Sequence, residues 1–488
     1  MWKENKDNIV IVGLYLIIQT ILIFAMDNYF LGSDNFSRVN ASWEIKNIDG
    51  INPTPDFLPL HFWLIYPISE LFQDYTYWPR LLNLPFGILG LVSVKNIATR
   101  LTRDDKIGFW CALVFVFSFP FNILSTLSLS DIINLGLLLG GISSLCKLEV
   151  EDNKKYLLFA ALFFSVANLV RMESWLIAFF FGVVLLIKRR NTISSVIPYA
   201  LITASPILYI LWTVYQNTGD PLWTIKYSDY EVLEATKWAL KITKIEYLGV
   251  FYKQTLAGTS PFLTVALAIL GFIKLGKNRS KWIYLSPIML LFIYQLYKIY
   301  TMTLISHFRY FMLSHVVFSM LALILIYKIF EHKKHTQKLI MITFIMISPI
   351  YSFYSLNESI LRDNAVYRFS EDFKRSLSFK DIIKPHSKVM IDNSNDFRHY
   401  PFEYMAPIRR DIEFSYECRV PIAFQYSVGF DEDWLNKCIK DHRPSYLITL
   451  ESGQLLKQVE ENPMNIELFK KLKFIKGHGK YHLYEIQY

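Results

Sequence analysis

The sequence has few cysteines and few charged residues for its length. Only four cysteines occur among 488 residues, and 19% of the residues are charged. Four cysteines are too few for the disulfide framework of a small secreted domain. Cys111 and Cys146 lie within apolar runs, where we expect them to be buried. Cys418 and Cys438 lie in a polar tail; they would pair in an oxidising compartment if the fold brings them together, which sequence alone does not show.

Several catalytic signatures are also missing. The sequence contains no Walker-type phosphate loop, no zinc-protease helix motif and no serine-centred nucleophile elbow. Internal repeats and low-complexity stretches are absent too, which mildly disfavours a transporter built from two repeated halves. The acidic triplet Asp431-Glu432-Asp433 lies in the tail and is typical of a helix start.

Long apolar runs dominate what is present. Hydrophobic residues make up 53% of the chain and aromatic residues 16%, more than in ordinary soluble domains. The runs are roughly 20 residues long, which suits a bilayer core of about 30 Å. We therefore expect a mainly α, polytopic membrane protein with about 11 spans. The runs are 9–25, 77–98, 107–124, 129–148, 156–170, 175–187, 194–215, 256–275, 282–300, 310–330 and 339–354.

The distribution of positive charge predicts the orientation. A net charge of +9 would suggest a nucleic-acid partner in a soluble protein, but here the lysines and arginines gather in alternate short loops. Membrane topology explains this pattern, with the N-terminus in the cytoplasm. The first run ends in Ala25-Met26-Asp27 without a small-x-small cleavage site, so we expect an uncleaved anchor and not a signal peptide. An odd number of spans places the C-terminus outside the cell membrane.

The sequence changes character after the last run. We predict a transmembrane domain over residues 1–355 and an extracytoplasmic α/β domain over residues 356–488. Charged residues are frequent in this tail, which also contains one helix-like segment at 431–440. Its strand-like segments are 388–391, 446–450, 474–475 and 481–486, and the last two read as a hairpin around Gly477-His478-Gly479.

The first outer loop, residues 27–76, carries most of the candidate chemistry. It is too polar for a span, yet rich in apolar residues at helical spacing, and loops of this kind beside a membrane are often functional. Asp34 and Arg38 are four residues apart, so a helical salt bridge is one interpretation. The other makes Asp34 a general base that takes a proton from a hydroxyl, while the planar fork of Arg38 binds a phosphate oxygen.

A second helical stretch begins near Pro55. It contains Asp56, which we expect to support the site, and His61. Its leucine and aromatic residues would let it lie in the membrane interface. His61 would then be either a cation for a lipid phosphate or simply an interfacial histidine.

Further ionisable residues lie at the predicted outer ends of the spans. Asp131, Arg171 and Glu173 are costly at such positions and tend to face a cavity or one another. A structural pair of Arg171 with Asp131 or with Glu173 is therefore one interpretation, and phosphate binding by Arg171 is the other. Arg309 and Tyr310 mark another outer edge, where they would either snorkel or contact a phosphate.

The order of these features resembles that of the C-type glycosyltransferases. The features are an early loop aspartate, then Pro-x-x-Leu-Pro-Leu-His-Phe-Trp-Leu, then Trp78-Pro79-Arg80-Leu81-Leu82-Asn83-Leu84 at the next span. Ser130-Asp131, Arg171-Met172-Glu173 and the Gly219-Asp220-Pro221 turn also fit. The resemblance is strongest to glycosyltransferase family 39, which contains protein O-mannosyltransferases and the lipid A aminoarabinose transferase. It covers about residues 1–355.

The resemblance implies a reaction and its partners. Members of the family transfer a sugar from a polyprenyl phosphate, typically with inversion, to a lipid, glycan or protein at the outer membrane face. The family's catalytic base corresponds to Asp34. The chain departs from protein O-mannosyltransferases by having Asp34-Asn35 instead of Asp-Glu, and from the aminoarabinose transferase by having His61 near the place of a lysine. No cofactor or nucleotide is required; a divalent metal is compatible with these residues but not needed.

Two other functions fit the sequence less well. A transporter or flippase of a lipid-linked saccharide would use the same basic residues without Asp34 as a base. It would also favour ionisable residues deep within the spans, whereas those named here lie at span ends. A membrane anchor whose tail is the functional part would leave the first loop unexplained.

Overall fold

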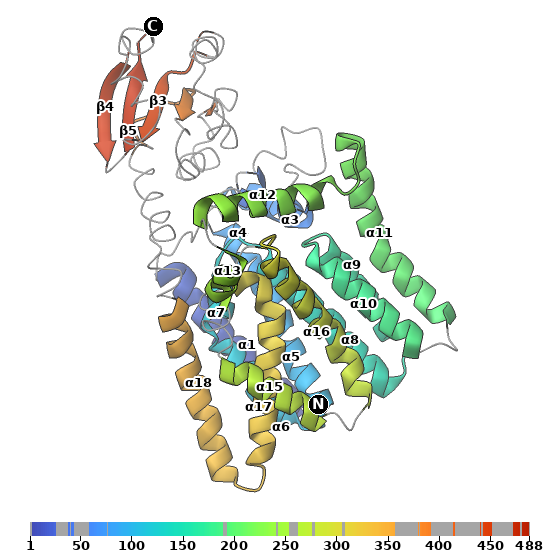
Figure 1. Ribbon diagram of the computed structural model, residues 1–488. Coiled ribbons are helices and arrows are strands. Elements are labelled where there is room, and N and C mark those ends of the chain that lie inside the picture. The colour runs from blue at the N-terminus through green and yellow to red at the C-terminus, as the bar shows by residue number, and fades with distance from the viewer. Residues whose placement is uncertain are drawn as a thin grey trace. The chain divides into compact units, whose positions relative to one another are not determined.

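The computed structural model in Figure 1 describes most of the helical part of the chain and parts of the tail. The chain divides into two compact units. The first comprises Met1–Asp27, Asn47–Ile65 and Pro79–Asp363, and the second comprises Asn28–Lys46, Tyr66–Trp78 and Asn364–Tyr488. The described residues are 2–25, 38–39, 41–42, 58–75, 77–188, 193–240, 243–252, 262–275, 279–304, 308–356, 379, 381–391, 413–414, 440, 443–450, 472–478 and 481–487.

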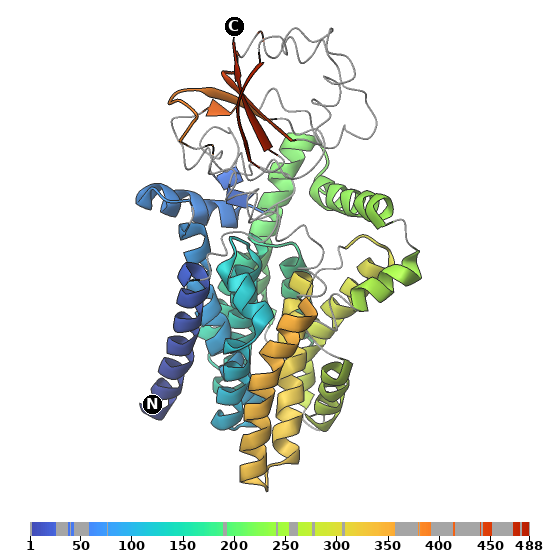
Figure 2. The same cartoon turned by 90° about the vertical axis from the view of Figure 1, so that its left-hand side faces the viewer.

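The first unit is a bundle of helices. Most of them run side by side, whereas α12 lies across their ends in both Figure 1 and Figure 2. Helices α3 (Leu60–Phe72) and α4 (Trp78–Leu81) contain residues of both units. The others are α1 (Trp2–Thr20) with the π-helical turn η1 (Ile21–Ala25), α5 (Asn83–Thr102), α6 (Asp105–Val116), α7 (Phe119–Thr126), α8 (Asp131–Glu151), α9 (Lys155–Asn168), α10 (Glu173–Lys188), α11 (Ile193–Thr218), α12 (Trp223–Leu240), α13 (Lys244–Phe251), α15 (Phe262–Leu275), α16 (Arg279–Tyr300), the 3₁₀ turn η5 (Phe308–Phe311), α17 (Met312–Ile329) and α18 (Lys334–Leu356).

Each of the predicted apolar runs contains a helix, which confirms the mainly α membrane fold. Among the described residues, five helices are long and apolar enough to cross a membrane, or six if one bent pair counts as a single span. Others, such as α9, are apolar but shorter. The count of about 11 spans therefore stays a prediction.

The bent pair is α6 and α7, whose axes differ by 59°. Pro120 near the start of α7 suits a helix N-terminus but not a continuous helix. A backbone break in a membrane must have its polar groups satisfied by the protein. Asn122 Nδ2 donates to the Val116 carbonyl at 2.9 Å, and Gln19 Nε2 of α1 donates to Asn122 Oδ1 at 2.8 Å. Side chains therefore stabilise the break.

Glycine lets two central helices approach closely. A Cβ atom on Gly136 of α8 would lie 2.2 Å from the carbonyl oxygen of Phe86 in α5. Small residues allow such backbone contacts between membrane helices, where packing and not hydrophobicity drives association. This contact fixes α8, whose first residue is Asp131, against α5.

The second unit contains a five-stranded mixed sheet with the order β2-β1-β3-β5-β4. Its strands are β1 (Lys388–Ile391), β2 (Glu413–Phe414), β3 (Tyr446–Leu450), β4 (Leu472–His478) and β5 (Tyr481–Ile486). Strand β1 pairs in parallel with β2 and β3, while β5 is antiparallel to β3 and β4. The predicted strands and hairpin are confirmed. Of the predicted helix 431–440 only Lys440 is described, and Cys418 and Cys438 lie outside the described residues.

Candidate active site

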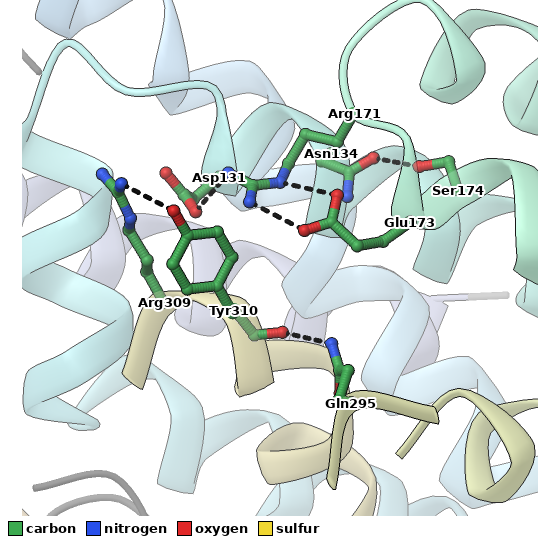
Figure 3. Close-up of polar contacts among 8 residues, drawn as sticks. All are labelled: Asp131, Asn134, Arg171, Glu173, Ser174, Gln295, Arg309 and Tyr310. Atoms are coloured by element: carbon green, nitrogen blue, oxygen red, sulfur yellow. Dashed lines mark hydrogen bonds and ion pairs between the residues drawn. The ribbon is translucent and has the colours of Figure 1, made fainter. Parts of the chain in front are cut away.

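An arginine held by two carboxylates forms the centre of the site in the first unit. Arg171 Nη1 donates to Asp131 Oδ1 at 2.9 Å. Its Nη2 and Nε donate to the two carboxylate oxygens of Glu173, at 2.9 and 3.3 Å. Figure 3 shows the guanidinium between the two acids. The side chain of Asp131 is 2% exposed, that of Arg171 12% and that of Glu173 23%. Both structural pairs considered from the sequence are therefore present.

Local structure explains this arrangement. Asp131 is the first residue of α8 and Glu173 is the first residue of α10, and acids are stabilised at helix N-termini. Arg171 lies in the tight turn between α9 and α10, where its N–H donates to the Ala167 carbonyl at 3.2 Å. Ser174 Oγ donates to Asn134 Oδ1 at 2.6 Å, which ties α10 to α8 beside the ion pairs.

Tyr310 lies between two arginines. Its ring centre is 4.9 Å from the guanidinium carbon of Arg171 and 5.0 Å from that of Arg309, both within cation–π range. Arg309 Nη2 also donates to the Tyr310 hydroxyl at 3.0 Å. Gln295 of α16 donates to the Tyr310 carbonyl at 2.7 Å and so holds the backbone of η5 (Figure 3).

The charged side chains of this site shift one another's pKa values. Burial lowers the pKa of the Arg171 guanidinium, but Glu173 and Asp131 raise it by more, so the pKa lies above its usual value. Burial raises the pKa of Glu173, but Arg171, a backbone hydrogen bond and Lys298 together lower it by more, so this pKa lies below its usual value. Both effects favour the charged forms of Arg171 and Glu173 at neutral pH.

A small cavity lies beside these residues. Its volume is ≈ 30 Å³, and its lining includes Asp131, Arg171, Gln295, Arg309 and Tyr310. A water molecule needs roughly 10–15 Å³ by this kind of measure. The cavity therefore has room for one or two water-sized groups and not for a whole sugar ring.

Two buried polar residues that were not predicted as site residues hold the chain that leads into Asp131. Arg80 is fully buried, and its Nε donates to the Thr126 carbonyl at 2.8 Å. Asn83 Nδ2 donates to the Leu127 carbonyl. These two carbonyls lie at the end of α7; Thr126 is five residues before Asp131 and Leu127 is four residues before it. Arg80 and Asn83 both belong to the segment that opens the second predicted span.

A further ion pair joins the site to α12. Lys298 Nζ of α16 is bound to Asp229 Oδ1 of α12. The charge of Lys298 also acts on Glu173 and lowers the pKa of that carboxyl. Acids and bases therefore alternate from Asp131 through Arg171, Glu173 and Lys298 to Asp229.

The structure brings together five of the predicted site residues: Asp131, Arg171, Glu173, Arg309 and Tyr310. His61 is fully buried in the first turn of α3. The N–H of its neighbour Leu60 donates to the Leu169 carbonyl at 3.1 Å, in the turn that carries Arg171. Arg38 is buried and lies in the second unit. Asp34 and Asp56 lie outside the described residues.

Sequence reasoning missed several residues of the site. Asn134, Ser174 and Gln295 are uncharged and lie within or directly beside apolar runs, so nothing marked them out. Lys298 and Asp229 were not among the predicted site residues. Asp229 and Lys298 are 69 residues apart, and such pairings depend on the fold.

Comparison with known proteins supports the resemblance seen in the sequence. Residues 53–215, about a third of the chain, match the family described as dolichyl-phosphate-mannose-protein mannosyltransferase. No curated protein matches the chain.

Solved structures share the fold. The crystal structure of ArnT from Cupriavidus metallidurans bound to undecaprenyl phosphate superposes with a TM-score of 0.64 and 10% identity, covering 98% of this chain and 97% of that one. Its apo state gives 0.60 and 9%, with the same coverage. The archaeal oligosaccharyltransferase AglB from Archaeoglobus fulgidus, in complex with an inhibitory peptide and a dolichol-phosphate, gives 0.53 and 11%, covering 94% of this chain and 70% of that one. The chain is thus an integral membrane protein with the fold of C-type glycosyltransferases, and it resembles the family 39 branch.

Proposed function

We propose that the protein is a membrane glycosyltransferase that moves a sugar from a polyprenyl phosphate to a hydroxyl of a lipid, glycan or protein at the outer membrane face. The fold shared with ArnT over 98% of the chain is the observation that carries this proposal, because that relative binds undecaprenyl phosphate. The match of residues 53–215 to a dolichyl-phosphate-mannose-dependent family supports it. In this proposal the N-terminus is cytoplasmic and the C-terminal domain is extracytoplasmic.

The reaction needs a base and a stabilised leaving group. The acceptor oxygen attacks the anomeric carbon, the bond from that carbon to the phosphate oxygen breaks, and polyprenyl phosphate leaves with the electron pair. We assign Asp34 as the base that takes the acceptor's proton, which gives inversion in a single displacement. Since the phosphate is already a good leaving group, the remaining task is to position the reactants and stabilise phosphate charge.

Arg309 is the arginine of this cluster that we assign to the phosphate. Its guanidinium stacks on Tyr310 and is oriented by the tyrosine hydroxyl, and a pre-oriented planar fork suits phosphate oxygens. Arg171 already makes three hydrogen bonds to two carboxylates. Its main task in this scheme is to hold Asp131 and Glu173 in place, and any phosphate contact by Arg171 is secondary. Arg38 and His61 are further candidates for the lipid phosphate.

The test is sugar transfer from a panel of mannose, glucose and 4-amino-4-deoxyarabinose donors on undecaprenyl and dolichyl phosphate. We expect wild type to turn over at least one donor. Asp34→Asn should lose roughly 100-fold or more while still binding that donor, and Asp105→Asn, an exposed acid at the start of α6, serves as the control. Arg309→Gln should weaken donor binding, whereas Arg100→Gln, paired with Glu151 at 3.4 Å, should not. Equal turnover by wild type and Asp34→Asn would remove Asp34 from the mechanism.

A transporter or flippase of a lipid-linked saccharide is the alternative. The 59° break between α6 and α7 favours it, because transporters often bind substrate at discontinuous helices. The same panel separates the two functions. Binding without turnover of every donor and acceptor, together with movement of the lipid across proteoliposome membranes, would support transport.

A further inference from the structure

Two buried hydrogen-bond acceptors beside Tyr310 lack a donor. They are Asp131 Oδ2 and Gln295 Oε1, and neither has a hydrogen-bond partner in the described part of the chain. The Asp131 side chain and the whole of Gln295 are each 2% exposed. Both residues line the ≈ 30 Å³ cavity. Buried acceptors without partners are rare, so each one calls for an explanation.

Each acceptor is held in place by the other polar atom of its own side chain. Asp131 Oδ1 accepts a hydrogen bond from Arg171 at 2.9 Å, which leaves Oδ2 of the same carboxylate without a donor. Gln295 Nε2 donates to the Tyr310 carbonyl at 2.7 Å. An amide whose nitrogen is committed in this way presents only its oxygen to any other group. The two acceptors are therefore set by the fold and cannot turn away to find donors.

The chemistry of the lining selects what can fill the cavity. Asp131 Oδ2 and Gln295 Oε1 are acceptors, so an occupant that satisfies both must donate hydrogen bonds. An ionised phosphate diester only accepts, so it does not satisfy them. The volume admits one or two groups of the size of water, which excludes a whole ring but admits a hydroxyl or an amino substituent.

We propose that this cavity is a subsite for one hydroxyl or amino substituent of the transferred sugar, with Gln295 as a residue that determines specificity. This inference rests on the proposed glycosyltransferase function. In the resting protein, water molecules fill the cavity and supply the donors. A sugar with the matching substituent replaces them, whereas a sugar without it leaves buried acceptors unpaired. Sites built to bind a hydroxyl discriminate strongly against analogues that lack it.

The experiment compares the sugar donor that wild type turns over in the panel above with its monodeoxy analogues, one for each ring substituent. Removal of the substituent that enters the cavity should lower kcat/KM of wild type by roughly 10- to 100-fold. The Gln295→Met variant should lose a similar factor with the parent donor. It should then discriminate less than about twofold between the parent and that one analogue, because the two changes remove the same interaction.

Gln19→Met is the matched control. Gln19 is also fully buried, donates through Nε2 to Asn122 and has an unmatched Oε1, but it does not line the cavity. Gln19→Met should keep the wild-type discrimination among analogues even if it is less stable. The comparison of the parent donor with its analogues on the wild-type protein does not depend on whether any variant folds.

Each outcome bears on a different statement. If wild type turns over no donor of the panel, the proposed function fails and the subsite falls with it. If wild type is active but treats all deoxy analogues alike, the cavity holds water only and the subsite is wrong. If Gln295→Met keeps the full discrimination of wild type, Gln295 does not determine specificity and the inference is overturned.

Discussion

Replacing Arg171 by methionine is expected to destabilise the helical unit strongly, because two carboxylates would lose their cation. The guanidinium makes three hydrogen bonds, one to Asp131 and two to Glu173. Removing one partner of a buried ion pair costs about 3–5 kcal/mol. Asp131, with a side chain 2% exposed, is shielded from bulk water and reaches only the small cavity, whereas Glu173 is 23% exposed and lies near Lys298. We therefore expect a loss of about 3–4 kcal/mol.

A charge-free version of the cluster separates this cause from simple loss of packing. The triple variant Arg171→Met, Asp131→Asn, Glu173→Gln removes the cation and both anions together. Replacing a whole buried ion cluster by neutral groups is often close to neutral in stability, so most of the loss should be recovered. Arg100→Met breaks the more exposed pair with Glu151 and should cost less than about 1 kcal/mol.

The assay is equilibrium unfolding in detergent micelles, followed by circular dichroism and checked for reversibility. From most to least stable, we expect the order wild type, Arg100→Met, the triple variant and the single Arg171 variant. A single variant as stable as Arg100→Met would show that the carboxylates do not depend on Arg171. A triple variant as unstable as the single one would show that packing and not charge sets the loss.

Three further predictions use the same unfolding assay. The charge swap Lys298→Asp with Asp229→Lys restores the ion pair between α16 and α12 but puts an acid beside Glu173. Stability should therefore stay about 1 kcal/mol below that of wild type. Stability equal to wild type would show that Lys298 acts only through its ion pair with α12 and not through Glu173. Burial raises the pKa of Glu173, but the Arg171 guanidinium, a backbone hydrogen bond and Lys298 together lower it by more, to a value below 4.5. The stability from this carboxylate is thus fully present above pH 4.5 and is lost as the pH falls through the lower folded value, and Glu173→Gln should flatten that decline. Gly136→Ala puts a Cβ atom 2.2 Å from a backbone carbonyl and should cost about 1–3 kcal/mol, whereas Gly249→Ala, with nothing within 4 Å, should be tolerated.

The membrane helices could be predicted because the bilayer imposes their length and composition. A span must satisfy its own backbone in an apolar solvent, so each apolar run contains a helix, although the run 107–124 is divided between α6 and α7. The strands 388–391 and 446–450 were also predictable, since their β-branched and aliphatic residues lie between turn-forming segments. In both cases the decisive information lies within about 20 consecutive residues.

In the segment between α11 and α15, prediction from local sequence patterns failed. No helix was predicted for residues 216–255, which lie between the apolar runs 194–215 and 256–275, yet they contain α12 and α13. Thr243 and Glu246 form a capping box at the start of α13, and this threonine-x-x-glutamate pattern is a known signal for a helix start. For α12 the deciding contacts are tertiary. Leu233 packs against a cluster that includes Phe311 and Ile299, far away in the sequence.

For the site, the sequence revealed charges but not their partners. Asp131, Arg171 and Glu173 were identifiable because ionisable residues are costly at span ends. Their geometry depends on α8 and on the turn before α10, whose ion-paired residues are 40 positions apart. Gln295 carried no signal at all, since one amide in an apolar helix is compatible with many environments. Only the fold shows that its nitrogen is committed and its oxygen is not.

The charge balance of the cluster bears on how a phosphate is bound. The acids Asp131, Glu173 and Asp229 are balanced by Arg171, Arg309 and Lys298, so these six side chains are neutral together. A sugar phosphodiester adds one negative charge, and the released polyprenyl phosphate carries close to two. In a medium of low dielectric constant, an uncompensated charge of that size is costly. If the proposed reaction takes place here, the positive charge that offsets it must come from residues outside the cluster. His61 of α3, a predicted phosphate ligand that belongs to the same unit as the cluster, is a candidate for that role.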